Sequence, residues 1–276
     1  MDIRSFFKPV PSVSVEKLRQ EMKGENREKV IVLDVRQPEE NQHARIPGSE
    51  LIPLGQIPHR ANELDKDKAI YVYCRSGNRS AAAAGMLLSA GFSEVYNVEG
   101  GMFSWDGMVA TGGLGSGMVF LQPGAPFEDV VAAAWAMEEG AAAFYRFVLE
   151  SLSDGDDIKK LLQELAGSED GHMDAIRKTY ISITGKDIEG ATSVYRGEGC
   201  CLEGGVKLSE AKKWAQTAEI DDILEFAMGV EANSYDLYSK LAREAKDGKT
   251  AGFFKNLADE EWKHLLLMTE KLKLEF

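Results

Sequence analysis

A cysteine followed closely by two arginines is the clearest chemical signal in the first half of the sequence. The run Ala69–Tyr73 favours a β-strand and delivers Cys74 to a short polar loop that opens an alanine-rich helix. A thiol placed there faces unpaired N–H groups and the positive end of a helix dipole, which favour the nucleophilic thiolate. Arg75 and Arg79 add forked donors suited to an oxyanion substrate. A buried core cysteine is the alternative, but it leaves the two arginines and Gly77 unexplained.

The spacing between Cys74 and Arg79 narrows the chemistry of this loop. Four residues separate them, one fewer than in the loop of a cysteine phosphatase, which must surround a whole phosphate. The tighter loop suits a single sulfur atom carried on the cysteine, because backbone N–H groups stabilise an anionic persulfide. The residues predicted to form this anion-binding loop are Arg75, Ser76, Gly77, Asn78, Arg79 and Ser80.

Further motifs accompany the Cys74 loop. They are an Asp-x-Arg ending of a predicted strand at Asp34 and Arg36, an Ile-Pro-Gly at residues 46–48, and a Gly-Gly-x-x-x-Trp at residues 100–105. Over roughly residues 10–110 the sequence resembles the single-domain rhodaneses, which are sulfurtransferases. The resemblance implies a Cys74 persulfide, a small sulfur donor such as thiosulfate and a thiol acceptor. It also adds Asp34 and Arg36 to the predicted catalytic site.

The second half of the chain carries a duplicated pattern of potential metal ligands. Residues 165–172 and 257–264 both read Leu-Ala-x-x-Glu-x-x-His, at an offset of 92 (264 − 172). Glu138 and Glu231 each precede a tyrosine by seven residues, at the similar offset of 93 (231 − 138). The two helix pairs are therefore predicted to be related by an internal duplication.

The spacing of these residues predicts a dinuclear metal centre. A glutamate and a histidine three residues apart share one helix face, so the two motifs and the two remaining glutamates can meet in a bundle core. Four buried carboxylates without a compensating cation would be very costly, and mixed carboxylate and imidazole ligands suit iron or manganese. Solvated helix faces are the alternative, but two of only four histidines fall at matching places. The predicted ligands are Glu138, Glu169, His172, Glu231, Glu261 and His264.

The helical half resembles the rubrerythrin branch of the ferritin-like family over roughly residues 127–275. The resemblance implies a centre of two iron ions that reacts with peroxide or dioxygen, with manganese as the other candidate. Rubrerythrins proper also carry two Cys-x-x-Cys pairs that hold a rubredoxin-type iron, and this chain has no Cys-x-x-Cys. An external electron donor is therefore expected. By analogy with ferritin-like relatives, we also expect a homo-oligomer.

The elements that must position these residues divide the chain into two predicted domains. Residues 1–110 are expected to form an α/β parallel-sheet domain, because short apolar strands alternate with helices. A glycine-rich linker is predicted over residues 111–126, and residues 127–276 are expected to form an all-α ferritin-like four-helix bundle. The expected strands are 30–35, 51–54, 69–73 and 95–98; the expected helices are 15–22, 57–64, 80–90, 127–152, 157–183, 217–246 and 250–273, with a long connection over 184–216.

Composition excludes several classes of partner. The net charge of −13 argues against nucleic acid and anionic membranes as partners, and no apolar run is long enough to span a membrane. Three cysteines and no recognisable signal peptide are expected of a cytoplasmic protein.

Cys200 and Cys201 lie in the long connection between helices. They are either a sulfur or redox relay or a pair of ordinary free thiols.

The sequence thus predicts a sulfurtransferase that moves sulfane sulfur through Cys74, coupled to a di-iron centre of oxidoreductase type. The alternatives are iron handling, in which the bundle binds or oxidises iron, and redox sensing without catalysis.

Overall fold

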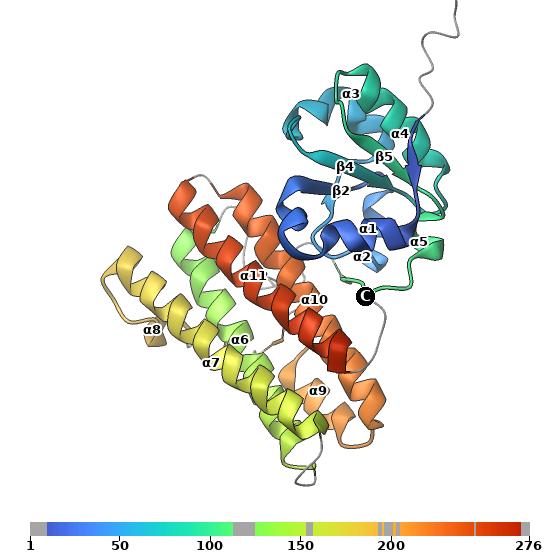
Figure 1. Cartoon of the computed structure of the whole chain (residues 1–276). Helices are drawn as coiled ribbons and strands as arrows, with labels where there is room; N and C mark the ends of the chain where they lie inside the picture. Colours follow the sequence, from blue (N-terminus) through green and yellow to red (C-terminus); the bar gives the residue numbers. More distant parts are fainter. Residues whose placement is uncertain are drawn as a thin grey trace, which may run out of the picture. The chain divides into compact units, whose positions relative to one another are not determined.

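The computed structural model describes residues 10–112, 125–152, 157–192, 195, 201–202, 205–245 and 247–271. The chain divides into two compact units, Met1–Thr111 and Gly112–Glu275 (Figure 1). The division falls at the start of the predicted glycine-rich linker, of which residues 113–124 lie outside the described part. Each unit has its own buried core.

The first unit is built on a parallel sheet of five strands in the order β1-β5-β4-β2-β3. The central strand β4 is flanked by β5 and β2, and both of its faces are covered, as is usual for parallel sheets. The strands are β1 Ser12–Val13, β2 Val30–Asp34, β3 Glu50–Leu51, β4 Ala69–Tyr73 and β5 Val95–Val98.

The helices of this unit are α1 Val15–Met22, α2 Pro38–His43, α3 Ile57–Arg60, α4 Asn78–Ser89 and α5 Gly101–Ser104, with 3₁₀ turns at Gly24–Lys29, Leu54–Gln56 and Ala61–Glu63. The predicted strand 51–54 is shorter than expected, because a 3₁₀ turn follows Pro53. Helix α2 was missed; Pro38 occupies its first turn, and the Glu40 carboxylate accepts the N–H of Gln37 at 3.2 Å. Strand β1 was also missed, because its pairing partner lies more than eighty residues away.

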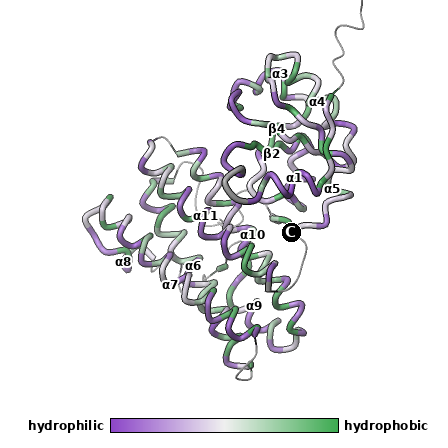
Figure 2. Tube along the Cα trace, in the orientation of Figure 1, coloured by the Kyte–Doolittle hydropathy of each residue, from purple (hydrophilic) through white to green (hydrophobic). Residues whose placement is uncertain are grey.

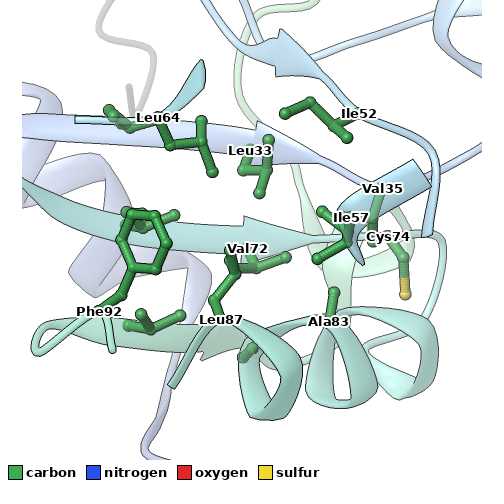
Figure 3. Packing of buried hydrophobic residues seen from close by; sticks show 14 residues of the cluster. Leu33, Val35, Ile52, Ile57, Leu64, Val72, Cys74, Ala83, Leu87 and Phe92 are labelled. Atoms are coloured by element: carbon green, nitrogen blue, oxygen red, sulfur yellow. The ribbon is translucent and has the colours of Figure 1, made fainter. Parts of the chain in front are cut away.

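One buried cluster fills the space between the sheet and helices α3 and α4. Side chains of β2 and β4 point alternately into it, and Leu87 and Ala83 of α4 meet them (Figure 3). Cys74 continues the row formed by Ile70 and Val72, with its sulfur at the edge of the cluster. The alternation of β4 therefore turns the thiol toward α4.

The second unit is a four-helix bundle made of two helical hairpins. Helix α6 packs against α7, and α10 packs against α11. Hydrophobic and hydrophilic residues alternate along these helices, as expected of helices with one buried face (Figure 2). Within the described residues, none of the helices combines the length and apolar character of a membrane crossing. The long helices are α6 Phe127–Leu149, α7 Asp157–Thr184, α10 Ile220–Glu244 and α11 Gly248–Lys271.

Two of the expected helix starts were wrong. The Thr217 hydroxyl donates to the Trp214 carbonyl at 3.3 Å, so it lies at the end of the preceding helix, and α10 begins only after Glu219. Helix α11 begins two residues before Thr250, because the Asp247 carboxylate accepts the N–H of Thr250 at 2.9 Å.

The long connection between the hairpins is more structured than predicted. It contains α8 Glu189–Thr192 and α9 Leu208–Ala215, and α9 packs against α6. Its chain also crosses α6 closely at Gly140, where an added Cβ would lie 2.6 Å from the Cys201 carbonyl oxygen. A residue larger than glycine at position 140 would push this crossing away from α6.

Candidate active site and metal centre

Cys74 follows directly on β4 and lies beneath the start of α4. Its side chain is buried, and the backbone N–H of Gly77 donates to its sulfur at 3.1 Å. Gly77 caps α4 with a left-handed φ of 99°, a conformation that favours glycine. The sulfur therefore lies at a helix N-terminus, where free N–H groups and the helix dipole favour an anion.

The surroundings of Cys74 act on its acidity in opposite directions. Burial raises the pKa of the thiol, whereas hydrogen bonds from the Ser80 hydroxyl and from the N–H groups of Ser80, Ser76 and Gly77 lower it. The net effect is a pKa below the ordinary value for cysteine. The loop thus favours the thiolate, which is the reactive form.

The predicted Gly-Gly motif holds this loop in place. The N–H of Met102 donates to the Cys74 carbonyl at 2.9 Å, and that of Phe103 donates to the Arg75 carbonyl at 3.0 Å. An added Cβ at Gly101 would lie 2.1 Å from the Cys74 carbonyl oxygen. The close approach of α5 to the loop is the physical reason for glycine at this position.

The two loop arginines have different partners. The Arg79 guanidinium binds both carboxylate oxygens of Glu40, at 2.7 and 2.8 Å, and this hydrogen-bonded pairing lowers the pKa of Glu40 to about 2. Exposed Arg75 instead lies over the ring of Phe103, 4.6 Å from its centroid. The Arg75 guanidinium is therefore open to the oxygens of a sulfur-donor molecule. Arg79 could bind such a molecule only after its hydrogen bonds to Glu40 break.

The predicted site residues Asp34 and Arg36 form a buried ion pair at the end of β2, with 2.6 Å between their closest atoms. Asn41 donates to Asp34 at 3.0 Å, and Arg36 lies over the ring of Tyr73, the residue before Cys74. These contacts anchor the ends of β2 and β4. The catalytic role of the pair therefore stays a prediction, and its contacts here are with the ends of the two strands.

Two residues that connect to Ser80 through hydrogen bonds, Asn97 and Ser12, were not predicted. Asn97 of β5 accepts a hydrogen bond from the Ser80 hydroxyl at 2.7 Å and donates to the Ser12 hydroxyl at 3.4 Å. Neither residue belongs to a motif with the cysteine. Asn97 meets Ser80, and Ser12 meets Asn97, because β5 pairs with both β1 and β4.

In the bundle, the structure brings together all six predicted metal ligands. Each is at most 6% exposed, and they fall into two groups of closely spaced donor atoms. Glu138, Glu169, His172 and Glu261 make one group, and Glu169, Glu231 and His264 make the other. Glu169 belongs to both.

The distances around the two histidines give the cluster an approximate twofold arrangement. His172 Nδ1 lies 3.2 Å from Glu138, 3.0 Å from Glu169 and 3.1 Å from Glu261. His264 Nδ1 lies 2.8 Å from Glu231, 3.4 Å from Glu261 and 3.9 Å from Glu169. Glu169 and Glu261 therefore reach both histidines, as bridging carboxylates would. Glu138 and Glu231 each reach only one, as terminal ligands would.

The donor atoms of this cluster fit divalent cations. Glu261 Oε1 is buried without a hydrogen-bond partner among the described residues, although His172 Nδ1 is only 3.1 Å away. Burial and the neighbouring carboxylates Glu138 and Glu231 raise the pKa of Glu169. Such crowding of buried acids is costly by itself and is relieved when cations bind between them.

Tyrosines complete the cluster in a crossed pattern. Tyr238 of α10 donates to Glu138 Oε1 of α6, and Tyr145 of α6 donates to Glu231 Oε1 of α10. The Oε2 atoms of the two carboxylates face the histidines. Each tyrosine thus holds the outer oxygen of a terminal glutamate and leaves the inner oxygen for a cation.

Of the two cysteines of the predicted relay, the structure describes one. Cys200 lies outside the described residues. Cys201 is buried, and burial raises the pKa of its thiol, which disfavours the thiolate that sulfur transfer needs.

The two units fall into two classes: an α/β domain with a buried cysteine at a helix N-terminus, and a ferritin-like bundle organised around buried carboxylates. The model of the Rubrerythrin family matches residues 129–272, more than half of the chain, and the chain belongs to this family. The model of the Rhodanese-like domain matches residues 14–108. The chain is therefore the predicted fusion of the two.

The chain is similar to known proteins over about a third of its length. The "Putative sulfur carrier protein YrkF" of Bacillus subtilis is 43% identical over 98 residues, which make up 36% of this chain and 52% of that protein. The "Thiosulfate sulfurtransferase GlpE" of Pseudoalteromonas translucida is 36% identical over 81 residues, which make up 29% of this chain and 77% of that protein. A solved rhodanese-like domain protein from Staphylococcus aureus is 32% identical, with a TM-score of 0.33, and covers 37% of this chain and 98% of its own. The chain spans about half the length of YrkF.

Proposed function

We propose that the first unit transfers sulfane sulfur through a persulfide on Cys74. The observation that carries this proposal is the hydrogen bond of 3.1 Å from the Gly77 N–H to the Cys74 sulfur at the start of α4. The same N–H groups that stabilise the thiolate can stabilise an anionic persulfide. Similarity to a thiosulfate sulfurtransferase supports thiosulfate as a donor.

The first step is a displacement at sulfur. The Cys74 thiolate attacks the outer sulfur of thiosulfate, a sulfur–sulfur bond forms on the cysteine, and the sulfur–sulfur bond of thiosulfate breaks. Sulfite leaves with the electron pair of the broken bond, and Cys74 becomes an anionic persulfide. Exposed Arg75 is placed to bind the oxygens of the donor with its forked N–H groups.

The second step returns the enzyme to its starting state. The thiolate of an acceptor attacks the terminal sulfur of the persulfide, the bond to the Cys74 sulfur breaks, and Cys74 leaves as a thiolate. The loop N–H groups stabilise this leaving group, so neither step needs an oxidant or a reductant.

The test uses the full-length protein, thiosulfate and dithiothreitol as acceptor. With both reagents, wild-type protein should release sulfite continuously. With thiosulfate alone, it should gain one sulfur atom on the tryptic peptide that ends at Arg75. Cys74→Ser should lose both signals, whereas Ser89→Ala, a change at the exposed far end of α4, should retain them. Transfer that persists in Cys74→Ser would overturn the proposal.

We further propose that the bundle binds two divalent cations, which the six clustered side chains would hold, with Glu169 and Glu261 in reach of both. The observation that supports this is the approach of both carboxylates to both His172 and His264. Iron held there would supply redox chemistry toward peroxide or dioxygen, and manganese suits the same donors.

Metal analysis of the purified chain tests this second proposal. About two cations per chain are expected from a ligand set of this kind, and Glu169→Ala should lower the content at both positions because it removes a bridge. An unchanged metal content in Glu169→Ala would contradict the assignment.

Experiments can distinguish three ways in which the two units could work together. Peroxide consumption that needs both Cys74 and the bundle ligands would support coupling, with the persulfide or an external donor supplying electrons. Iron uptake beyond the two expected positions would support iron handling, and turnover by neither unit would support sensing.

A further inference from the structure

Asn97 is a buried amide in a strand that is otherwise suited to apolar residues. It is 6% exposed and lies between β1 and β4, where it pairs with Ser12 and Val72. A buried amide is costly unless its donors and acceptor are satisfied. The contacts of Asn97 therefore show what holds it at this position.

Those contacts form a continuous hydrogen-bonded chain that ends at the reactive sulfur. The Asn97 amide bonds the exposed Ser12 hydroxyl at 3.4 Å on one side and the buried Ser80 hydroxyl at 2.7 Å on the other. The Ser80 hydroxyl lies 3.4 Å from the Cys74 sulfur. This series of hydrogen-bond contacts runs from the exposed edge of the sheet to the Cys74 sulfur.

The Ser80 hydroxyl has more acceptors than it can serve. It has one hydrogen, and three acceptors lie within reach: Asn97 Oδ1 at 2.7 Å, the Gly77 carbonyl at 3.0 Å and the Cys74 sulfur at 3.4 Å. As long as Asn97 presents its oxygen, this oxygen competes with the sulfur for the hydrogen and lies at the shortest of the three distances.

The amide can present its nitrogen instead. Both neighbours of Asn97 are serine hydroxyls, which donate or accept equally well, so turning the amide by half a turn keeps both contacts. In that orientation Ser12 donates to Oδ1, Nδ2 donates to the Ser80 oxygen, and the Ser80 hydrogen is free for Cys74. Hydroxyls and the amide reorient, and no covalent bond breaks.

We propose that Asn97 is a positioning residue that turns the Ser80 hydroxyl toward the Cys74 sulfur when that sulfur carries negative charge. A neutral thiol leaves the hydrogen with Asn97, and a thiolate or persulfide attracts it. This inference deepens the proposed function and rests on Cys74 as its nucleophile. Its test below measures thiolate formation without sulfur transfer, so the two can fail separately.

The experiment measures the rate of Cys74 alkylation by iodoacetamide against pH in the full-length protein. Alkylation is counted on the tryptic peptide that ends at Arg75, which separates Cys74 from Cys200 and Cys201. Without the amide, the Gly77 carbonyl at 3.0 Å is the nearest acceptor for the Ser80 hydrogen. Asn97→Leu should therefore move the midpoint of the profile upward by about one pH unit, or roughly a tenfold loss of thiolate below the midpoint. Melting followed by circular dichroism confirms the fold.

A double-mutant cycle with Ser80→Ala separates positioning from general disturbance. Because Asn97 acts through the Ser80 hydroxyl, Asn97→Leu should cause no further shift in the Ser80→Ala background. Equal shifts of the midpoint in both backgrounds would overturn the proposal, as would an unchanged midpoint in Asn97→Leu alone.

A second variant guards against misfolding of Asn97→Leu. Asn97→Asp keeps the shape of the side chain, but a carboxylate only accepts hydrogen bonds and so keeps the Ser80 hydrogen. The negative charge of the aspartate raises the midpoint in the wild-type and the Ser80→Ala backgrounds alike. In the wild-type background, the sulfur also loses the hydrogen bond from Ser80, which adds to the shift. The proposal would also be overturned if Asn97→Asp shifted the midpoint by no more in the wild-type background than in the Ser80→Ala background.

Discussion

Tyr238 of α10 donates a hydrogen bond of 2.5 Å to Glu138 of α6, the terminal carboxylate of the other half of the internal duplication. Tyr145 and Glu231 make the reciprocal contact. Each half of the duplicated sequence therefore supplies the hydrogen bond that orients a ligand of the other half. The carboxylate cluster joins the two hairpins through its tyrosines as well as through Glu169 and Glu261, which reach both histidines.

The first prediction concerns this tyrosine. Tyr238→Phe removes the donor to Glu138 Oε1, so the carboxylate loses its orientation, and we expect about 10–100-fold weaker binding of one of the two cations. Stepwise titration of the metal-free protein with Co²⁺ measures the loss. Tyr180→Phe makes the same chemical change on α7 and serves as the matched control. Equal affinities in both variants would argue against the orienting role.

The second prediction concerns a difference between the two histidines. His264 Nε2 lies 2.6 Å from the Ser168 hydroxyl, whereas buried His172 Nε2 has no hydrogen-bond partner in the described part of the chain. A partner on the outer nitrogen fixes the ring and raises its basicity as a ligand. Ser168→Ala should therefore weaken only one of two Co²⁺ binding steps, by about tenfold.

A titration of Ser168→Ala that weakens both steps alike would contradict this asymmetry. Ser168→Thr keeps a hydroxyl at this position and should bind Co²⁺ with the same two affinities as the wild-type protein.

The third prediction concerns acid stability. The hydrogen-bonded pairing with Arg79 depresses the pKa of Glu40 from 4.5 to about 2. A depressed pKa in the folded state means that the pair stabilises the fold above pH 4.5 and loses this contribution as pH falls through about 2. Because the pair is partly exposed, Arg79→Met should cost at most about 1 kcal/mol near neutral pH.

Urea unfolding of wild-type protein and Arg79→Met, followed across this pH range, tests the assignment. The difference in free energy of unfolding should shrink toward low pH. A difference that grows as the pH falls would have the wrong sign.

The fourth prediction concerns the close contact between α5 and the cysteine loop. Gly101→Ala places a Cβ 2.1 Å from the Cys74 carbonyl oxygen, so the loop must move and both stability and sulfur transfer should fall. Gly91→Ala is a matched control, because Gly91 has a positive φ but open space around its Cβ position. Each change carries a backbone penalty of about 1 kcal/mol, and only Gly101→Ala should also lose transfer.

Those features of the protein that depend on local spacing along the chain could be predicted before the structure was known. The Cys74 loop could be predicted because a strand, a glycine and a helix start follow one another within a few residues. The helices that carry the ligands could be predicted because a glutamate and a histidine three apart must share a helix face, and because the pattern occurs twice.

Contacts between side chains far apart in the sequence could not be predicted and became visible with the folded structure. The pairing of β1 with β5 brings Ser12 close to Asn97, and the position of α2 beside the loop allows Glu40 to bind Arg79. In the bundle, a tyrosine of each hairpin donates a hydrogen bond to a glutamate of the other. Such contacts depend on the register and packing of whole elements, and no local pattern of residue types records them. The same dependence explains why Thr217 and Thr250 were taken for helix caps when neighbouring side chains and packing set the ends.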